Sequence, residues 1–108
     1  MKTALLILAL LAAPCSAQDR DWRPASDVIV PPPAYDPLVR GWPKNVRIVE
    51  VPFAKMQAMC NIPRVQACYQ SKYRRIVIPS GMPADLRAAT LRHEGAHAYG
   101  WKHPLRGK

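Results

Sequence analysis

The alternation of hydrophobic and polar residues predicts two β-strands in the second half of the chain. Residues 45–53, NVRIVEVPF, alternate with the two-residue period of a strand. Residues 72–80, KYRRIVIPS, contain three consecutive β-branched side chains, which favour a strand. Arg74 and Arg75 at the start of this second segment are typical of a strand at the edge of a sheet. We therefore expect residues 72–80 to form an edge strand.

A helical pattern follows the second strand and runs from about Pro83 to Tyr99. Pro83 suits a first-turn position, and Gly100 is placed to end the helix in the left-handed conformation that glycine adopts easily. Spacings of three and four residues put one set of side chains on a common face: Leu86, Ala89, Thr90, His93 and His97. A shorter helical turn is expected over Ala54–Cys60. The order strand, strand, helix predicts a small α+β domain.

Residues 18–43 form a proline-rich arm that precedes these elements. Pro31, Pro32 and Pro33 impose polyproline geometry, and further prolines prevent a long helix. The arm also carries more hydrophobic side chains than a spacer needs: Trp22, Val28, Ile29, Val30, Tyr35 and Trp42. We therefore expect the arm to wrap the domain or to dock a partner.

The first 17 residues are typical of an export signal. Lys2 precedes an apolar core over residues 4–13, and small residues stand before a cut at Gln18. The apolar core is shorter than the ~20 residues of a membrane span, and no later stretch is long enough. Acylation of Cys15 is an alternative, which Pro14 directly before it disfavours. We expect a secreted or periplasmic mature chain without a transmembrane span.

Cleavage of the signal would leave two cysteines, Cys60 and Cys68. An even pair in an oxidising compartment predicts a disulfide, which the loop-entropy description values at roughly 2–3 kcal/mol for so short a ring. Two free thiols are the alternative.

The chain is basic, with 16 Lys and Arg against 7 Asp and Glu. This charge favours anionic partners, such as an anionic component of the cell envelope. The basic residues are spread from Arg20 to Lys108 without one dense arm, so nucleic acid is not favoured. A merely solvated surface is the alternative.

All three histidines of the chain fall within the stretch HEGAHAYGWKH. On a helix, His93 and His97 lie one turn apart and present their imidazoles to one point. Glu94 points beside that position, where a base acting on zinc-activated water is required. Gly100 ends the helix, and His103 follows three residues later, close enough to turn back. The stretch predicts a metal site.

Three imidazoles suit zinc, and they leave the fourth position of a tetrahedral ion open, as in catalytic sites. No acidic residue of this sequence follows Glu94, so we do not expect a third ligand from a later glutamate. The expected cofactor is one Zn²⁺ per chain. Three neighbouring side chains receive structural interpretations: we expect Trp101 and Tyr99 to pack, and Arg92 to be a solvated helix residue.

The stretch resembles the long zinc signature of the metzincin metallopeptidases, H-E-x-x-H-x-x-G-x-x-H, at every fixed position. The resemblance implies that His93, His97 and His103 bind zinc, that Glu94 is the general base and acid, and that Gly100 makes the turn. It covers roughly residues 72–103 and does not reach the proline-rich arm.

Two features depart from the metzincin pattern. Ala96 stands where the family usually has a glycine before the second histidine, and Gly95 precedes it. The family also has a methionine-containing turn downstream of the motif. No methionine follows His103, and those after residue 17 lie upstream: Met56, Met59 and Met82.

The resemblance implies a zincin-like domain over residues 44–108, with a short sheet and a C-terminal active-site helix. The expected function is that of an exported zinc-dependent metallopeptidase, with a peptide or protein substrate aligned along the strand Arg75–Ile78. Two alternatives stay open: a non-catalytic zinc-binding protein that retains the site, and an adaptor on an anionic envelope surface.

Overall fold

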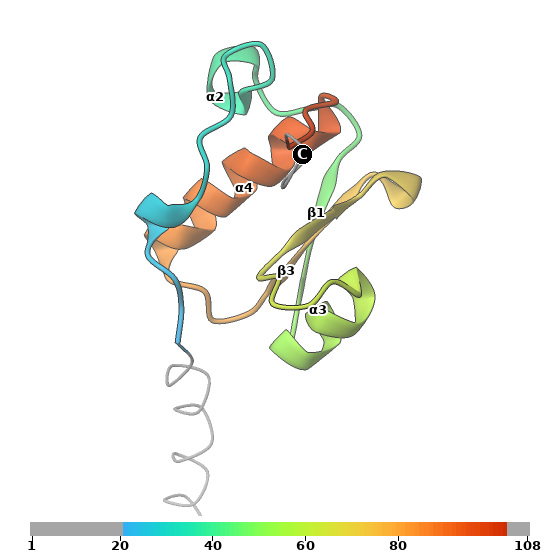
Figure 1. Ribbon diagram of the computed structural model, residues 1–108. Coiled ribbons are helices and arrows are strands. Elements are labelled where there is room, and N and C mark those ends of the chain that lie inside the picture. Colours follow the sequence, from blue (N-terminus) through green and yellow to red (C-terminus); the bar gives the residue numbers. More distant parts are fainter. Residues whose placement is uncertain (1–20, 104–108) are drawn as a thin grey trace, which may run out of the picture.

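The computed structural model describes residues 21–103 as an α+β fold with a three-stranded sheet (Figure 1). The expected signal peptide lies outside the described residues, as does the segment 104–108. The strands are β1 (Arg47–Val51), β2 (Cys68–Gln70) and β3 (Arg75–Pro79). The helices are α2 (Pro37–Arg40), α3 (Phe53–Cys60) and α4 (Ala84–Ala98), and two 3-10 turns are η2 (Ala25–Asp27) and η3 (Ser71–Tyr73).

The sheet is mixed, with strand order β1-β3-β2. β1 runs parallel to β3, with Arg47 opposite Arg75 and Val51 opposite Pro79. β2 pairs with the other side of β3 in the antiparallel direction, with Cys68 opposite Val77. β3 is therefore the central strand, and the α+β class expected from the sequence is confirmed.

The expectation that residues 72–80 form an edge strand is wrong. β2 occupies the side of β3 that would otherwise be open, and this strand is too short to produce a hydrophobic period that the sequence could reveal. Arg75, the first residue of β3, lies at the end of the sheet, where its side chain has two partners. Its guanidinium donates from Nε to Gln70 Oε1 over 2.5 Å and lies 4.4 Å from the centre of the Tyr73 ring. A substrate cannot pair with β3, because both of its edges are already used.

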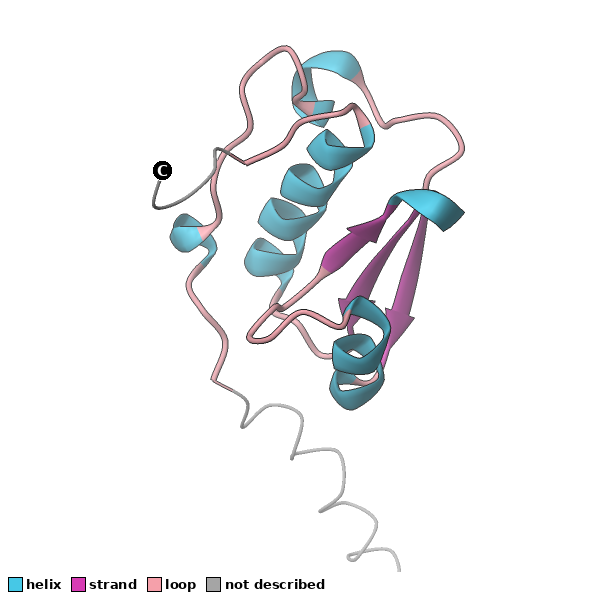
Figure 2. Cartoon of the chain, turned by 45° about the vertical axis from the view of Figure 1, so that its right-hand side comes forward, coloured by secondary structure: helices cyan, strands magenta, loops and turns pink. Residues whose placement is uncertain are grey.

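The hydrophobic core lies on both faces of β3. Ile76 and Ile78 face one cluster, which Leu91 and Ala98 of α4 complete, whereas Val77 faces the opposite cluster with Met56 of α3. α4 and α3 thus cover opposite faces of the sheet (Figure 2). All three β3 side chains are fully buried.

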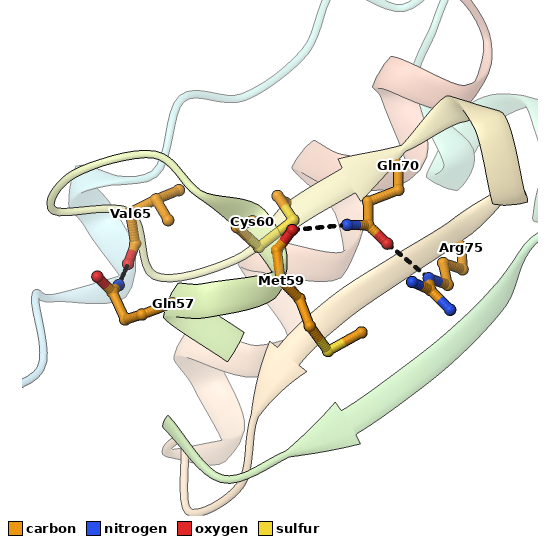
Figure 3. Close-up of a disulfide and its surroundings, with 7 residues drawn as sticks. Gln57, Met59, Cys60, Val65, Gln70 and Arg75 are labelled. Atoms are coloured by element: carbon orange, nitrogen blue, oxygen red, sulfur yellow. Dashed lines mark hydrogen bonds between the residues drawn. A yellow bond between two sulfur atoms is a disulfide. The ribbon is translucent and has the colours of Figure 1, made fainter. Parts of the chain in front are cut away.

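The predicted disulfide is present between Cys60, the last residue of α3, and Cys68, the first residue of β2 (Figure 3). The Cα atoms of the pair are 5.8 Å apart. Gln70 Nε2 donates to the carbonyl oxygen of Met59 over 2.8 Å, and the side chain of Gln57 donates to the carbonyl of Val65. The loop between α3 and β2 is thus closed by a covalent bond and two side-chain hydrogen bonds.

α4 extends within one residue of the predicted helix at each end. Pro83 is its N-cap residue, and Gly100 follows the helix with a φ of +102°, as its glycine identity predicted. Two backbone donors in this turn satisfy carbonyl groups of the last helical residues: Gly100 N–H donates to His97 over 2.9 Å, and Trp101 N–H to Ala96 over 3.2 Å. The chain therefore reverses directly after the helix.

The proline-rich arm lies along α4 (Figure 1). Gly95 is the point of closest approach, because a β-carbon there would lie 2.9 Å from Pro37 Cγ and 3.2 Å from Trp42 Cζ3. Tyr99 donates its hydroxyl proton to the carbonyl of Gly41 over 2.7 Å. Among the residues described, no helix has the length and apolar character needed to cross a bilayer.

Candidate metal centre

The three histidine side chains converge at the C-terminal end of α4. His93 Nε2 and His97 Nε2 each lie 3.1 Å from His103 Nε2. Tetrahedral zinc with bonds of 2.0–2.1 Å would hold its ligand atoms about 3.3 Å apart. Within residues 21–103 no other group of three metal-ligating side chains comes together in this way. The predicted triad is therefore assembled, and it could hold a metal ion.

Two backbone carbonyls determine which ring nitrogens are free. His93 Nδ1 lies 2.8 Å from the oxygen of Ile29, and His97 Nδ1 lies 2.7 Å from the oxygen of Trp101. Because a carbonyl only accepts, each Nδ1 carries the hydrogen and each Nε2 presents a lone pair. Such outer partners orient metal-binding imidazoles. One of these two partners comes from the arm, 64 residues from the histidine it orients.

Trp101 packs among the imidazoles. Its ring stacks on His97 with centroids 5.1 Å apart and an interplanar angle of 13°, and it meets His93 edge-on at 5.0 Å. Only 9% of Trp101 is exposed. Tyr99 packs as well, beneath the guanidinium of Arg40 at 4.3 Å. Both aromatic residues are therefore structural, as expected from the sequence.

Burial lowers the pKa of His93 and of His97 below the ordinary value for histidine. Their carbonyl partners oppose this shift, whereas the neighbouring imidazoles add to it by disfavouring a second positive charge. A metal ion binds imidazole only in its neutral form. The environment thus keeps the two helical histidines in the form that can bind.

Glu94 is partly buried beside the triad and is not a member of it. Burial raises the pKa of Glu94 to about 7, although a hydrogen bond from the backbone of Tyr69 in β2 acts in the opposite direction. Its carboxyl group therefore lies at the junction of α4 and β2. The sequence predicted this position next to, rather than within, the ligand set.

Two clefts meet at Glu94 and His103. One, of about 250 Å³, lies between α4 and arm residues 23–29. The other, of about 390 Å³, extends from the triad toward Ile62 and Lys102. Glu94, His103, Val65 and Ala67 line both clefts. The candidate ligands are thus accessible from two sides.

Arg92 is not the solvated helix residue that we expected. Its guanidinium forms a two-pronged ion pair with Asp36 of the arm, with Nε 3.0 Å from Oδ1 and Nη2 2.5 Å from Oδ2. Asp36 is only 3% exposed and also accepts from the backbone of Leu38 at the start of α2. The hydrogen bond from Arg92 lowers the pKa of Asp36. No local pattern predicts this pair, because its members are 56 residues apart.

Comparison of the chain with known protein families, with characterised proteins and with solved structures finds no match.

Proposed function

We propose that this protein is an exported zinc-dependent metallopeptidase. His93, His97 and His103 would hold the ion, and Glu94 would be the general base. The observation that carries the proposal is the convergence of three Nε2 atoms beside a glutamate, at the meeting point of two clefts. The disulfide is consistent with the extracellular or periplasmic location that the expected signal peptide implies.

The donor set fits zinc. Three neutral imidazoles are typical zinc ligands, and three protein ligands leave the open position of a catalytic site. The two cysteines that could complete a closed structural site are bonded to each other. A fourth protein ligand is thus absent from the group that residues 21–103 assemble.

A zinc ion bound there would act as a Lewis acid, polarising a peptide carbonyl and lowering the pKa of water. Glu94 would accept the proton from the attacking water and later pass it to the leaving amine. Its partly buried position beside β2 would hold the carboxyl group at the junction of the clefts, where a peptide chain can extend on either side. Trp101 would shield one side of the imidazoles and keep their orientation fixed.

A second candidate is a non-catalytic metal-binding protein. It is favoured by the mutual packing of Trp101 with all three imidazoles, whose ring centres lie 4.8–5.1 Å apart. A metal ion in such a cluster would stabilise the turn that follows α4 even without turnover.

The deciding experiment compares wild type with Glu94→Gln, both loaded with one zinc, against a broad peptide library. The substitution keeps the side chain's size and removes its basicity, so hydrolysis should fall by on the order of 10²–10⁴ while zinc content stays unchanged. Glu50→Gln is the matched control, because Glu50 is the only other glutamate and lies exposed on β1, paired with Arg87.

Equal cleavage by wild type and Glu94→Gln would show that Glu94 is not the base. Stoichiometric zinc with no cleavage of any peptide by wild type would favour the non-catalytic protein instead.

A further inference from the structure

One end of the molecule concentrates positive charge. At this end β1 and β3 begin, α4 ends, and α2 and η3 lie beside them (Figure 1). We call it the basic end, and its basic side chains are Arg40, Lys44, Arg47, Lys72, Arg74, Arg75 and Lys102. All of them are exposed except Arg75, which is partly buried.

Contacts and strand register connect several of these residues across separate segments of the chain. Arg40 lies over the ring of Tyr99, at the C-cap of α4. Arg74 Nη2 donates to the carbonyl of Lys44 over 2.6 Å, which connects η3 to the start of β1. Arg47 stands opposite Arg75 in the parallel register. The charges are therefore neighbours in space, although they come from four separate segments of the chain.

Carboxylates that could neutralise this end lie elsewhere in the described part of the chain. Asp36 is buried and paired with Arg92, and Glu50 pairs with Arg87 nearer the far end of β1. Asp85 lies in the first turn of α4, at the opposite end of that helix. Asp27 is in η2, which packs against α4. Glu94 lies nearer, since it lines the larger cleft together with Lys102, but it is partly buried. Among residues 21–103 the two ion pairs are Arg87–Glu50 and Arg92–Asp36, and neither includes a residue of the basic end.

Hydrophobic side chains project from the same end. Leu38 is 75% exposed, Val39 is 67% exposed and Trp42 is 43% exposed, and all three belong to α2 or the turn after it. Tyr73 of η3 is 51% exposed and lies between Lys72 and Arg75, both of which contact its ring. Aliphatic and aromatic side chains surrounded by Lys and Arg are the composition of protein surfaces that lie on membranes.

We propose that the basic end docks onto an anionic phospholipid surface. Lys and Arg would contact the headgroups, and Leu38 and Val39 would enter the boundary between headgroups and acyl chains. The positive charge of the basic end alone would attract any polyanion. The exposed aliphatic pair favours lipid, because a wall polymer or a nucleic acid offers no apolar phase for it. The inference does not depend on the peptidase proposal.

Docking in this orientation would bring the candidate metal centre close to the bilayer. Lys102 belongs to the basic end, and it also lines the larger cleft together with His103 and Ser71. The cleft would then open near the membrane surface, so that partners of the site would be membrane-proximal.

The test is flotation of the full mature protein with vesicles of phosphatidylcholine, with and without phosphatidylglycerol. Wild type should float only with the anionic vesicles, and added salt should weaken binding because the charges are exposed. Lys44→Glu with Lys72→Glu should weaken binding by at least about 25-fold, since each basic residue near an anionic surface contributes about fivefold. Leu38→Ser with Val39→Ser should weaken it by about tenfold.

Two single substitutions of the same kinds, away from the basic end, are the controls. Lys55→Glu reverses an exposed charge on α3, at the opposite end of β1, and Val30→Ser removes an aliphatic side chain that is 63% exposed on the arm. Both should bind like wild type. Thermal melting of every variant identifies any that fails to fold.

Three results would overturn the proposal. One is no flotation of wild type with anionic vesicles at low salt. Another is unchanged binding of the Leu38→Ser, Val39→Ser protein, which would make the surface a general polyanion binder. The third is equal loss of binding in Lys55→Glu, which would mean that the net charge of the whole chain acts without a defined surface.

Discussion

The two halves of this small protein are held together by different means. In the first, which we call the stapled half, α3, β2 and β3 surround Met56, Cys68 and Val77, and the Cys60–Cys68 disulfide closes the loop. In the second, the site half, the arm lies on α4 through an ion pair, side-chain hydrogen bonds to backbone carbonyls, and a tight contact at Gly95.

The halves share β3, whose Ile76 and Ile78 pack against Leu91 and Ala98 of α4, but the cross-link lies in one half and the candidate site in the other. The stapled half buries apolar side chains and has its own covalent cross-link, so it requires nothing from a bound ion. The site half contains the three histidines, and its polar contacts orient them. A bound metal ion would cross-link the site half, because it would connect α4 to the chain beyond Gly100. The disulfide is the corresponding cross-link in the stapled half.

Among the variants that test the difference between the two halves, His103→Ala should have the largest effect, which is on zinc affinity. This change removes the one candidate ligand that lies outside α4. The zinc affinity should fall by more than about 100-fold, beyond the usual cost of losing an outer partner of a ligand. Isothermal titration with zinc measures the affinity. The melting temperature of the metal-free protein should stay close to that of wild type, because the stapled half is untouched.

Lys102→Ala is the control for that variant, since it changes an exposed neighbour that is not a ligand. Unchanged zinc affinity in His103→Ala would mean that the third ligand lies elsewhere.

The converse experiment replaces Cys60 and Cys68 together by serine. The free energy of unfolding should decrease by roughly 2–3 kcal/mol, because the unfolded chain regains the freedom that the short ring removes. Denaturant titration measures the loss. Zinc affinity of the folded protein should be the same as in wild type, and a large decrease in it would show that the two halves are not separate.

Gly95→Ala should have the smallest effect, a change in the free energy of unfolding. Alanine favours a helix by up to about 1 kcal/mol over glycine, but here its β-carbon would overlap the Pro37 and Trp42 rings, and such overpacking costs about 1–3 kcal/mol. The expected net result is a loss of about 1 kcal/mol in the free energy of unfolding. The tryptophan emission of the protein, to which Trp42 contributes together with Trp22 and Trp101, should also shift as the arm moves away from α4.

Ala88→Gly, at an exposed position of the same helix, is the control, because it reports helix propensity without a clash. A more stable Gly95→Ala protein would show that the arm does not pack closely against this helix in solution.

Local chemistry in the sequence determined α4 and most of the candidate metal site. α4 followed from apolar spacing and from the residues at its two ends, Pro83 and Gly100. The histidine triad followed from positions one helical turn apart and a glycine that reverses the chain. The disulfide followed from two cysteines close in sequence. In each case the interacting residues lie within about ten positions of one another, so their spacing carries the information.

Only the tertiary structure decided the features that join distant segments. β3 is central because Cys68–Gln70 pairs with its second edge, and three residues are too few to form a recognisable pattern. Arg92 meets Asp36, and His93 meets the carbonyl of Ile29, across 56 and 64 residues. Every residue has a backbone carbonyl, so the sequence does not indicate that Ile29 supplies this one. The sequence also does not distinguish a solvated arginine from a partly buried one in an ion pair, such as Arg92. Such contacts exist only once packing has brought the segments together.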